Sequence, residues 1–286
     1  MSRLRVVSYN IHKGRSALLS RASLNELRLG LHGLGPDLVF LQEVQGRNDR
    51  LGALDAQHES LAAALGLNVA YGCNAVRRHT AHGNALLTRY PVLSHENQDI
   101  SDHRLEQRGL LHVEVQIGQH DVHCFVVHLG LFAGSRTRQA EAMIQRIHEL
   151  VPAHCPILIA GDFNDWNDRL SAELIRRLQV HEVFATAPQA RGEGLPRLRE
   201  GLARMRAALR DPEGLELLRP QAPRLGDGDQ ALAARPPRTF PAAMPWFRLD
   251  RIYQRGFAVR QARVLRGKPW TSLSDHAPLL ADLELP

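Results

Sequence analysis

The sequence has little of several features that would assign a chain to a special class. Its 286 residues include three cysteines, Cys73, Cys124 and Cys155. Their odd number and irregular spacing argue against a disulfide framework or a cysteine metal site, so we expect reduced, packed thiols. No apolar run approaches the roughly 20 residues needed to cross a bilayer, and the N-terminus lacks a signal-peptide core. These absences predict a cytoplasmic chain with no transmembrane segment.

Aromatic residues are scarce, at 5% of the chain, which gives little sign of a stacking platform for single-stranded nucleic acid. Lysine is nearly absent as well: Lys13 and Lys268 are the only two, yet arginine brings the formal charge to +6. A basic chain suits a polyanionic partner, either DNA or RNA or an anionic membrane surface. A solvated basic surface explains the charge equally well, and the oligomeric state is left unknown.

What is present is a mixture of strand and helix patterns. Eight short apolar or β-branched runs predict strands, at residues 4–8, 38–41, 84–88, 110–117, 122–127, 157–160, 249–253 and 278–283. Apolar residues at helical spacing predict helices over residues 24–34, 59–65 and 140–151, and Ser23 with Glu26 resembles a capping box. The turn-like residues 118–121 predict a hairpin, so at least part of the sheet is antiparallel.

One stretch departs from the rest, being rich in Pro, Gly and Arg without a strand signal. We place this Arg-rich insertion at residues 191–235 within a single domain of residues 1–286. Leu198, Leu202, Met205 and Leu209 fall at helical spacing and predict one short amphipathic helix in it. A lid packed on the main domain and an element that contacts substrate or membrane both remain open.

Polar residues follow several of the apolar runs, where sites commonly collect. Asn10 ends the first predicted strand, Glu43 follows the second, and His128 follows residues 122–127. Each one alone has an ordinary explanation, as a turn former, a solvated acid or a core histidine. A carboxylate held near a core must, however, be paired, hydrogen-bonded or bound to a metal.

Two further segments carry stronger signals. Gly161 allows a tight turn after a buried strand, and Asp162 and Asn164 can point the same way from an extended backbone. Near the C-terminus, Asp275 and His276 place a hard ligand beside a titratable imidazole. Asp250 is a natural partner for His276, because a carboxylate orients the ring and raises its basicity.

Taken in order, Asn10, Gln42-Glu43, His128-Leu129, Gly161-Asp162-Phe163-Asn164, Leu249-Asp250 and Ser274-Asp275-His276 span nearly the whole chain. This order resembles the endonuclease/exonuclease/phosphatase family, and the closest resemblance is to bacterial members with Asn-Ile-His-Lys-Gly and Gly-Asp-Phe-Asn-Asp-Trp motifs. The resemblance implies an α+β fold, a four-layer α/β/β/α sandwich of two mixed, largely antiparallel sheets flanked by helices. It also places the ends of all six segments at one edge of the sheets.

The resemblance implies a metal site as well. Glu43 is similar to the principal metal carboxylate of the family, with Asn10 and Asp275 nearby, and oxygen ligands select Mg²⁺ or Mn²⁺. Asp162, beside Asn164, would orient or deprotonate the attacking water. His276, held by Asp250, and His128 would donate hydrogen bonds to the phosphoryl group or protonate the leaving group, and the general acid is not decided between them.

Substrate contacts are expected from three further residues. Asn84 lies in a segment similar to the Gly-Asn-Ala stretch of the family, and Lys13 and Arg15 follow Asn10, where they could steer an anionic substrate. The sequence departs from the deoxyribonuclease branch in one respect. In that branch the first histidine of the site, which corresponds to His128, has a glutamate partner, whereas the matching segment around His82 contains no acidic residue. The role of His128 is then closer to phosphate binding, as in the lipid and phosphatase branches.

We therefore expect a divalent-metal-dependent phosphoesterase that hydrolyses phosphodiester bonds, most simply a nuclease of the endonuclease/exonuclease type. The alternatives are a phosphodiesterase or phosphatase acting on phospholipid or small phosphate esters, as in sphingomyelinases and inositol phosphatases. A third possibility is a catalytically inactive module that binds nucleic acid or membrane. The sequence itself does not choose the substrate.

Overall fold

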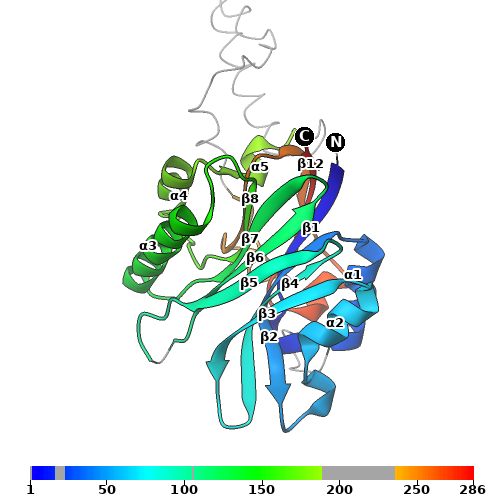
Figure 1. Ribbon diagram of the computed structural model, residues 1–286. Coiled ribbons are helices and arrows are strands. Elements are labelled where there is room, and N and C mark those ends of the chain that lie inside the picture. Colours follow the sequence, from blue (N-terminus) through cyan, green and yellow to red (C-terminus); the bar gives the residue numbers. More distant parts are fainter. Residues whose placement is uncertain (1, 17–22, 105, 189–235) are drawn as a thin grey trace, which may run out of the picture.

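The computed structural model describes residues 2–16, 23–104, 106–188 and 236–286. Two six-stranded sheets pack face to face, and helices cover the outer face of each sheet (Figure 1). This is the four-layer sandwich expected from the sequence. The predicted insertion at residues 191–235 lies outside the described residues, as does its amphipathic helix.

The first sheet has the strand order β11-β12-β1-β2-β4-β3. Its strands are β1 (Ser2–Asn10), β2 (Leu38–Asn48), β3 (Asn68–Val76), β4 (Thr80–Thr88), β11 (Ala258–Val264) and β12 (Leu279–Leu285). β1 pairs parallel with β2 and antiparallel with β12. The two chain ends therefore lie next to each other, at one end of this sheet (Figure 1).

The second sheet has the order β5-β6-β7-β8-β10-β9. Its strands are β5 (Val92–Asp99), β6 (Gly109–Ile117), β7 (His120–His128), β8 (Ile157–Asp162), β9 (His181–Glu182) and β10 (Asp250–Arg255). β6 and β7 form the antiparallel hairpin predicted around residues 118–121. β7 and β8 run parallel, and β10 runs antiparallel to β8.

Helices close the two outer faces. The first sheet carries α1 (Leu24–Leu34), α2 (Gln57–Leu65) and α8 (Trp270–Leu273), and the second carries α3 (Ala133–Leu150) and α4 (Ser171–Leu178). Short elements complete the list: α5 (Val183–Thr186), η1 (His12–Gly14) and η2 (Gly52–Leu54). No described helix is long and apolar enough to span a bilayer.

Alternation along the central strands builds three hydrophobic layers. On β2, Leu38 and Phe40 point between the sheets, whereas Val39 and Leu41 face α1 and α2, and all four are fully buried. A strand that is covered on both faces must be apolar at every position. This is why the central strands appear in the sequence as continuous apolar runs.

The strands that the sequence did not reveal are the four at the sheet edges: β3, β5, β9 and β11. An edge strand has one neighbour and one partly solvated side, so polar residues are tolerated, as in Ser94 to Asp99 of β5. The predicted capping box is also wrong. Ser23 precedes α1 but makes no side-chain cap, and its hydroxyl donates instead to the carbonyl of Leu273. The three cysteines are unpaired, as expected, and Cys124 is buried, but Cys73 is exposed, so the prediction that all three are packed is wrong.

Candidate active site

The polar residues that follow the apolar runs meet at one edge of the sandwich. β1, β7 and β8 all end there, and the antiparallel strands β10 and β12 begin there. Pairing places His128, Asp162 and Asp250 at the same level on three adjacent strands, because His128 and Asp250 are both register partners of Asp162. Asn10 ends β1 on the facing sheet. Topology thus collects residues that lie far apart in the sequence.

Two residues of the site, Glu43 and Asn164, have an irregular backbone conformation that orients their side chains. Glu43 has a φ of 56° and sits where the register between β2 and β4 shifts, so the strand bulges at this residue. Asn164 also has a positive φ, 49°. Non-glycine residues rarely adopt this conformation, and such strain clusters at functional sites. The two residues are held in place by the surrounding fold.

Gly161 is required for a different reason. Its φ is 152°, and a Cβ at this position would lie 1.9 Å from the carbonyl oxygen of Val127 on the neighbouring strand. Only glycine lets β8 approach β7 this closely. The close approach brings Asp162 alongside His128.

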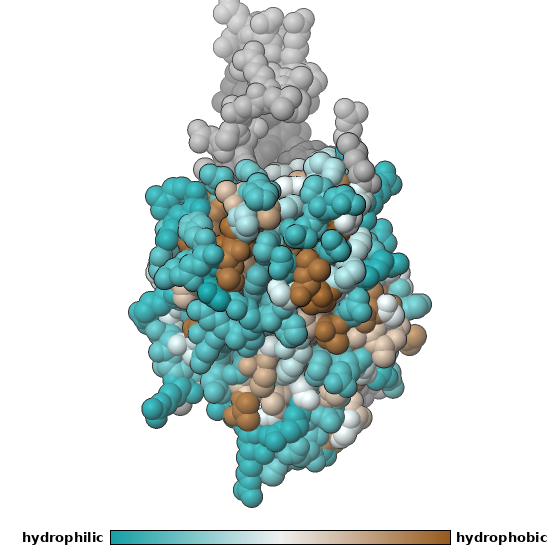
Figure 2. All heavy atoms as spheres, viewed as in Figure 1, coloured by the Kyte–Doolittle hydropathy of each residue, from teal (hydrophilic) through white to brown (hydrophobic). Residues whose placement is uncertain are grey.

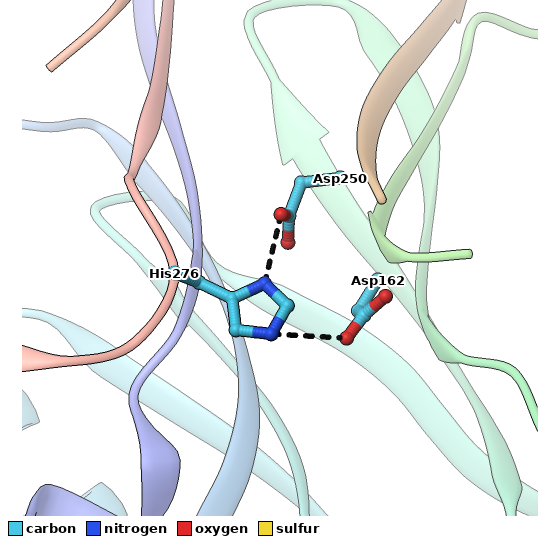
Figure 3. Close-up of side chains that lie close together, drawn as sticks. All are labelled: Asp162, Asp250 and His276. Atoms are coloured by element: carbon cyan, nitrogen blue, oxygen red, sulfur yellow. Dashed lines mark hydrogen bonds and ion pairs between the residues drawn. The ribbon is translucent and has the colours of Figure 1, made fainter. Parts of the chain in front are cut away.

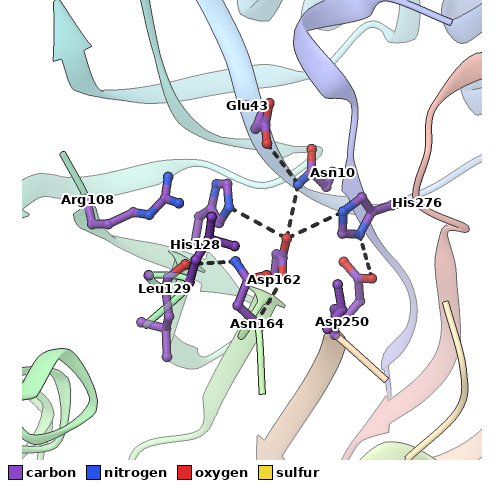
Figure 4. A network of polar contacts seen from close by, with 12 residues as sticks. Asn10, Glu43, Arg108, His128, Leu129, Asp162, Asn164, Asp250 and His276 are labelled. Carbon is purple, nitrogen blue, oxygen red and sulfur yellow. Dashed lines mark hydrogen bonds and ion pairs between the residues drawn. The ribbon is translucent and has the colours of Figure 1, made fainter. Parts of the chain in front are cut away.

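Asp162 is the centre of the site (Figure 4). Its Oδ2 accepts a hydrogen bond from Asn10 Nδ2 at 3.2 Å and lies 3.6 Å from the Nε2 atoms of both His128 and His276. Its Oδ1 accepts from the backbone N–H of Asn164 at 2.9 Å. The carboxylate is therefore fixed between two imidazoles.

His276 bridges two carboxylates (Figure 3). Its Nδ1 donates to Asp250 Oδ2 at 2.9 Å, and its Nε2 faces Asp162. Burial alone would lower the pKa of His276, but the charges of Asp250 and Asp162 outweigh it and raise the pKa to about 10. The ring is a cation at neutral pH.

His128 differs from His276 in its charge. Burial, helped by the nearby Arg108, lowers the pKa of His128 to about 3, although Asp162 and Glu43 oppose the shift. It is therefore neutral at physiological pH. Burial opposes ionisation of Glu43, but His128 and Lys13 more than compensate and hold its pKa well below the usual range. Because His128 is itself uncharged near neutrality, Lys13 is the effective cation there.

Two places at this edge could hold a metal ion. Ligand atoms of Asp162, Asp250 and His276 lie within 4.8 Å of one another. However, the raised pKa of His276 favours the doubly protonated ring, which would offer no lone pair to an ion at this place. The other place is formed by the carboxylates of Glu43 and Asp275, which line the same cavity. Asn10 lies beside them, with its Nδ2 3.4 Å from Glu43 Oε1 and its Oδ1 accepting from the backbone N–H of His12. These oxygen donors suit a hard divalent cation.

Lys13 and Arg15 differ in their relation to the site. Lys13 Nζ lies 2.5 Å from Glu43 Oε2 and so belongs to the cluster. Arg15, partly buried, is absent from the residues that line the cavity. Asn84 is fully buried between the sheets, and its Nδ2 donates to the carbonyls of Gly109 and Val126. The expected substrate contact of Asn84 is therefore corrected: its amide cross-links β4 to β6 and β7, out of reach of a substrate.

The cavity at this edge has a volume of about 410 Å³. It is lined by Glu43, Arg108, His128, Leu131, Asp162, Asn164, Trp166, Phe240, Phe247, Leu249, Asp275 and His276. A larger hollow of about 810 Å³ lies at the opposite ends of β1 and β12. There Arg3 pairs with Glu284 and Arg5 with Asp282, so the charges are already neutralised. The smaller cavity holds the chemically competent groups.

Three kinds of residue in this site were given no role from the sequence. Arg108 lines the cavity, with its guanidinium 3.1 Å from Glu106 Oε1. Ser274 donates from its hydroxyl to the carbonyl of Asn10 at 2.7 Å, which anchors the Ser-Asp-His segment. Aromatic side chains form one wall, and the Phe240 ring lies 4.9 Å from the His276 ring. The position of Arg108 directly before β6 was the only available signal.

Comparisons with known proteins agree with this geometry. A model of the endonuclease/exonuclease/phosphatase family matches residues 7–276. The chain is 33% identical over 290 residues to the protein YbhP of Escherichia coli (strain K12), covering 98% of this chain and 96% of YbhP.

Solved structures of the family share the fold. A family protein from Bacteroides vulgatus superposes with a TM-score of 0.69 at 17% identity, covering all of both chains. The human Nocturnin catalytic domain, solved with a bound sulfate anion, gives a TM-score of 0.66 at 18% identity, covering 99% of this chain and 94% of that domain. The matched family segment contains every motif residue from Asn10 to His276. The chain therefore belongs to the endonuclease/exonuclease/phosphatase family.

Proposed function

We propose that this protein is a divalent-metal-dependent hydrolase of phosphodiester bonds. One observation carries the proposal: a carboxylate, Asp162, is fixed between two imidazoles, one cationic and one neutral, beside the carboxylate of Glu43. Such a site can position a water, donate protons and bind a hard cation together. Membership of a family that includes phosphoesterases supports the same conclusion.

The donor set fits Mg²⁺ or Mn²⁺. Glu43, Asn10 and Asp275 offer oxygen atoms and no thiolate, which favours a hard cation over Zn²⁺. The ammonium group of Lys13 at 2.5 Å from Glu43 shows that the cluster accommodates positive charge. A bound divalent ion would neutralise charge that develops on the scissile phosphate. We expect Glu43 to be its principal ligand.

Asp162 is placed to orient the attacking water. Its orientation is fixed by Asn10 and by the backbone of Asn164, whose own amide is anchored to the carbonyl of Leu129 at 2.9 Å. Water adds through its oxygen to phosphorus and gives up one proton to Asp162, the bond from phosphorus to the leaving oxygen breaks, and the departing alkoxide takes up a proton and leaves as the alcohol. No covalent enzyme intermediate is needed.

His276 is the better proton donor of the two imidazoles. It is protonated at neutral pH, and Asp250 fixes its ring with Nε2 directed toward Asp162 and the cavity. His128 is neutral and serves as a hydrogen-bond donor or acceptor to the phosphoryl group. Arg108 adds a permanent positive charge to the same wall. These groups would stabilise the extra negative charge of the transition state.

The net charge of +6 supports nucleic acid as one substrate, and this nuclease reading remains the first to test. Phospholipid or small phosphate esters form the second class, favoured by the apolar wall of Phe240, Phe247 and Leu249. A non-catalytic binding module would not require Asp162 and His276 to be held in this arrangement.

The test is a substrate panel with Mg²⁺ or Mn²⁺: plasmid DNA, RNA, phospholipid and the soluble ester bis(4-nitrophenyl) phosphate. We expect hydrolysis of the soluble ester that EDTA abolishes and that Mg²⁺ or Mn²⁺ restores. A protein that hydrolyses nothing in the panel, while retaining a salt-sensitive affinity for nucleic acid or vesicles, would support the binding module instead.

Metal binding can be measured apart from activity. Calorimetric titration with Mn²⁺ should give a binding isotherm that Glu43→Gln weakens by at least about tenfold, because one charged ligand is lost. The matched control is Glu284→Gln, which changes a carboxylate at the opposite end of the sandwich. Equal Mn²⁺ affinity in both variants would refute the assignment of Glu43.

A further inference from the structure

Exposed apolar side chains gather around the mouth of the active-site cavity. Among the described residues, the exposed large hydrophobic side chains number ten, and six lie on three loops at this mouth. They are Leu131 (52% exposed), Phe132 (65%), Trp166 (40%), Met244 (63%), Trp246 (60%) and Phe247 (47%). The other four, Leu29, Leu51, Val76 and Leu93, lie on separate elements. We call the group of six the apolar rim.

The rim includes the tip of a short hairpin. Phe240 and Phe247 pair across it and line the cavity, while Met244 and Trp246 occupy the turn between them. The Trp246 side chain is 60% exposed. The hairpin therefore extends apolar side chains outward beyond the reacting groups.

Two buried arginines hold the three loops together. Arg136 donates to the carbonyls of Gly130 and Leu131 and lies 4.8 Å from the centre of the Trp166 ring. Arg251, only 1% exposed, donates to the carbonyls of Asp165 and Arg248. The rim side chains are thus presented on a supported backbone, and a patch of this kind on one face commonly marks a binding surface.

The charge of the rim suits an anionic partner. Residues 236–249, which carry the hairpin, contain Arg238 and Arg248 and no acidic residue. Arg104 and Arg169 are exposed on the adjoining loops, and the acidic residues Asp102, Glu106 and Asp168 of these loops are each paired with another arginine. The face drawn in Figure 2 is mainly hydrophilic, with separate hydrophobic areas. Protruding apolar groups flanked by arginine are the pattern of a surface that lies at a membrane interface.

Base stacking explains the rim less well. Leu131 and Met244 have no aromatic face, and one face of the Trp166 ring is already covered by Arg136. A stacking platform needs successive open rings. A lipid surface accepts aliphatic and aromatic groups alike, because burial of apolar area drives the interaction.

From these observations we infer that the apolar rim docks the protein on an anionic phospholipid surface and that its substrate is a phosphate ester of a lipid. The substrate assignment rests on the proposed hydrolase function, whereas the docking does not. Leu131, Trp166 and Phe247 of the rim also line the cavity, so docking would bring lipid head groups close to Asp162 and His276. The lipid remains in its layer while its phosphate enters the site.

The docking is tested by sedimentation with vesicles of phosphatidylcholine, with and without phosphatidylglycerol, in EDTA so that no hydrolysis occurs. The protein should bind the vesicles that contain phosphatidylglycerol, and added salt should weaken this binding. The double variant Met244→Ser, Trp246→Ala should bind at least about tenfold more weakly, because it loses two apolar anchors. Hydrolysis of the soluble ester should be unchanged in this variant.

The matched control is the double variant Leu29→Ser, Leu93→Ser, which removes two equally exposed apolar side chains away from the rim. It should bind vesicles like the wild type. Absence of vesicle binding by a protein that hydrolyses the soluble ester would overturn this inference and leave the hydrolase proposal standing. Vesicle binding by a protein that does not hydrolyse the soluble ester would support the docking and overturn the hydrolase proposal.

Two further outcomes would also overturn the inference. If the rim variant loses affinity for a single-stranded oligonucleotide and not for vesicles, the rim is a stacking surface. If light scattering shows that the rim variant changes the oligomeric state while vesicle binding persists, the rim is an interface between copies of this chain.

Discussion

Two buried histidines in this protein differ in charge, one being a cation and the other neutral at neutral pH. His276 at the active site is 5% exposed and His112 on the outer face of the β6–β7 hairpin is 6% exposed, yet their pKa values are about 10 and about 4. His276 lies between Asp250 and Asp162, whereas His112 Nε2 faces another imidazole, Nδ1 of His123, at 3.0 Å. Solvent exposure is nearly the same, and the carboxylates beside His276 reverse the effect that burial has on the pKa of His112.

The comparison separates a reactive site from a structural one. At the active site, two carboxylates keep the buried His276 ring protonated. The ring can therefore donate a proton to a leaving group. On the hairpin face, two neutral rings share one proton, and His112 stacks on Phe125 at 4.5 Å. Substitutions at each place should therefore affect different measurements.

The largest effect is expected from Asp162→Asn. The amide cannot accept a proton and places a donor between two imidazoles, so kcat should fall by about a thousandfold or more. The measurement is hydrolysis of bis(4-nitrophenyl) phosphate with saturating Mn²⁺. Asp282→Asn, at the far end of β12, is the control and should keep full activity. Activity within a few-fold of wild type in Asp162→Asn would remove this residue from the mechanism.

A smaller loss is expected from Asp250→Asn. This change removes the negative charge that orients and protonates His276, and kcat should fall by about a hundredfold with little change in KM. Nuclear magnetic resonance of the His276 ring provides an independent measurement, since its signals should move toward those of a neutral imidazole. A variant with unchanged kcat and a charged His276 would show that Asp162 alone sets the ring's state.

Acid should destabilise the fold through His112. Burial and the neighbouring His123 lower the pKa of His112 to about 4, below the value near 6.5 of an unfolded histidine. The unfolded chain therefore takes up a proton first. The neutral His112 ring stabilises the fold fully above pH 6.5. This stabilisation is lost as the pH falls toward 4, which lowers the free energy of unfolding by about 2 kcal/mol.

Urea unfolding of wild type and His112→Phe across this pH range measures the contribution. The phenylalanine keeps the stacking on Phe125 but cannot titrate, so the variant should lose less stability on acidification. Parallel losses in the two proteins would place the acid sensitivity elsewhere.

The smallest change is expected from Asn84→Ala. Because Asn84 is an interior cross-link, the free energy of unfolding should fall by about 1 to 2 kcal/mol while KM stays the same. Urea unfolding and steady-state kinetics measure the two quantities together. A raised KM with unchanged stability would restore the substrate contact that the sequence suggested.

Part of the architecture could be predicted from single segments. The central strands β1, β2, β7 and β8 were visible because burial on both faces leaves no room for polar residues. The edge strand β11 was hidden because its Arg, Gln and Ala residues meet solvent on one side. Ser23 looked like a helix cap, but contact with the Leu273 carbonyl gave its hydroxyl a different partner.

Part of the candidate site could also be predicted from single segments. Asp162 and His276 could be named because each follows or precedes a buried strand in a recognisable motif. Arg108 and the apolar rim could not, since Leu131, Trp166 and Trp246 belong to three loops that only the folded chain brings to one mouth.

The sequence by itself determined which residues end the central strands and in what order, because strand periodicity and the cost of burying polar groups act locally. Only the tertiary structure decided their charges and roles. Asn84 became a cross-link, His276 a cation and His128 a neutral ring through partners that strand pairing and sheet packing supply. Electrostatic effects depend on distance in space, and the fold alone sets that distance.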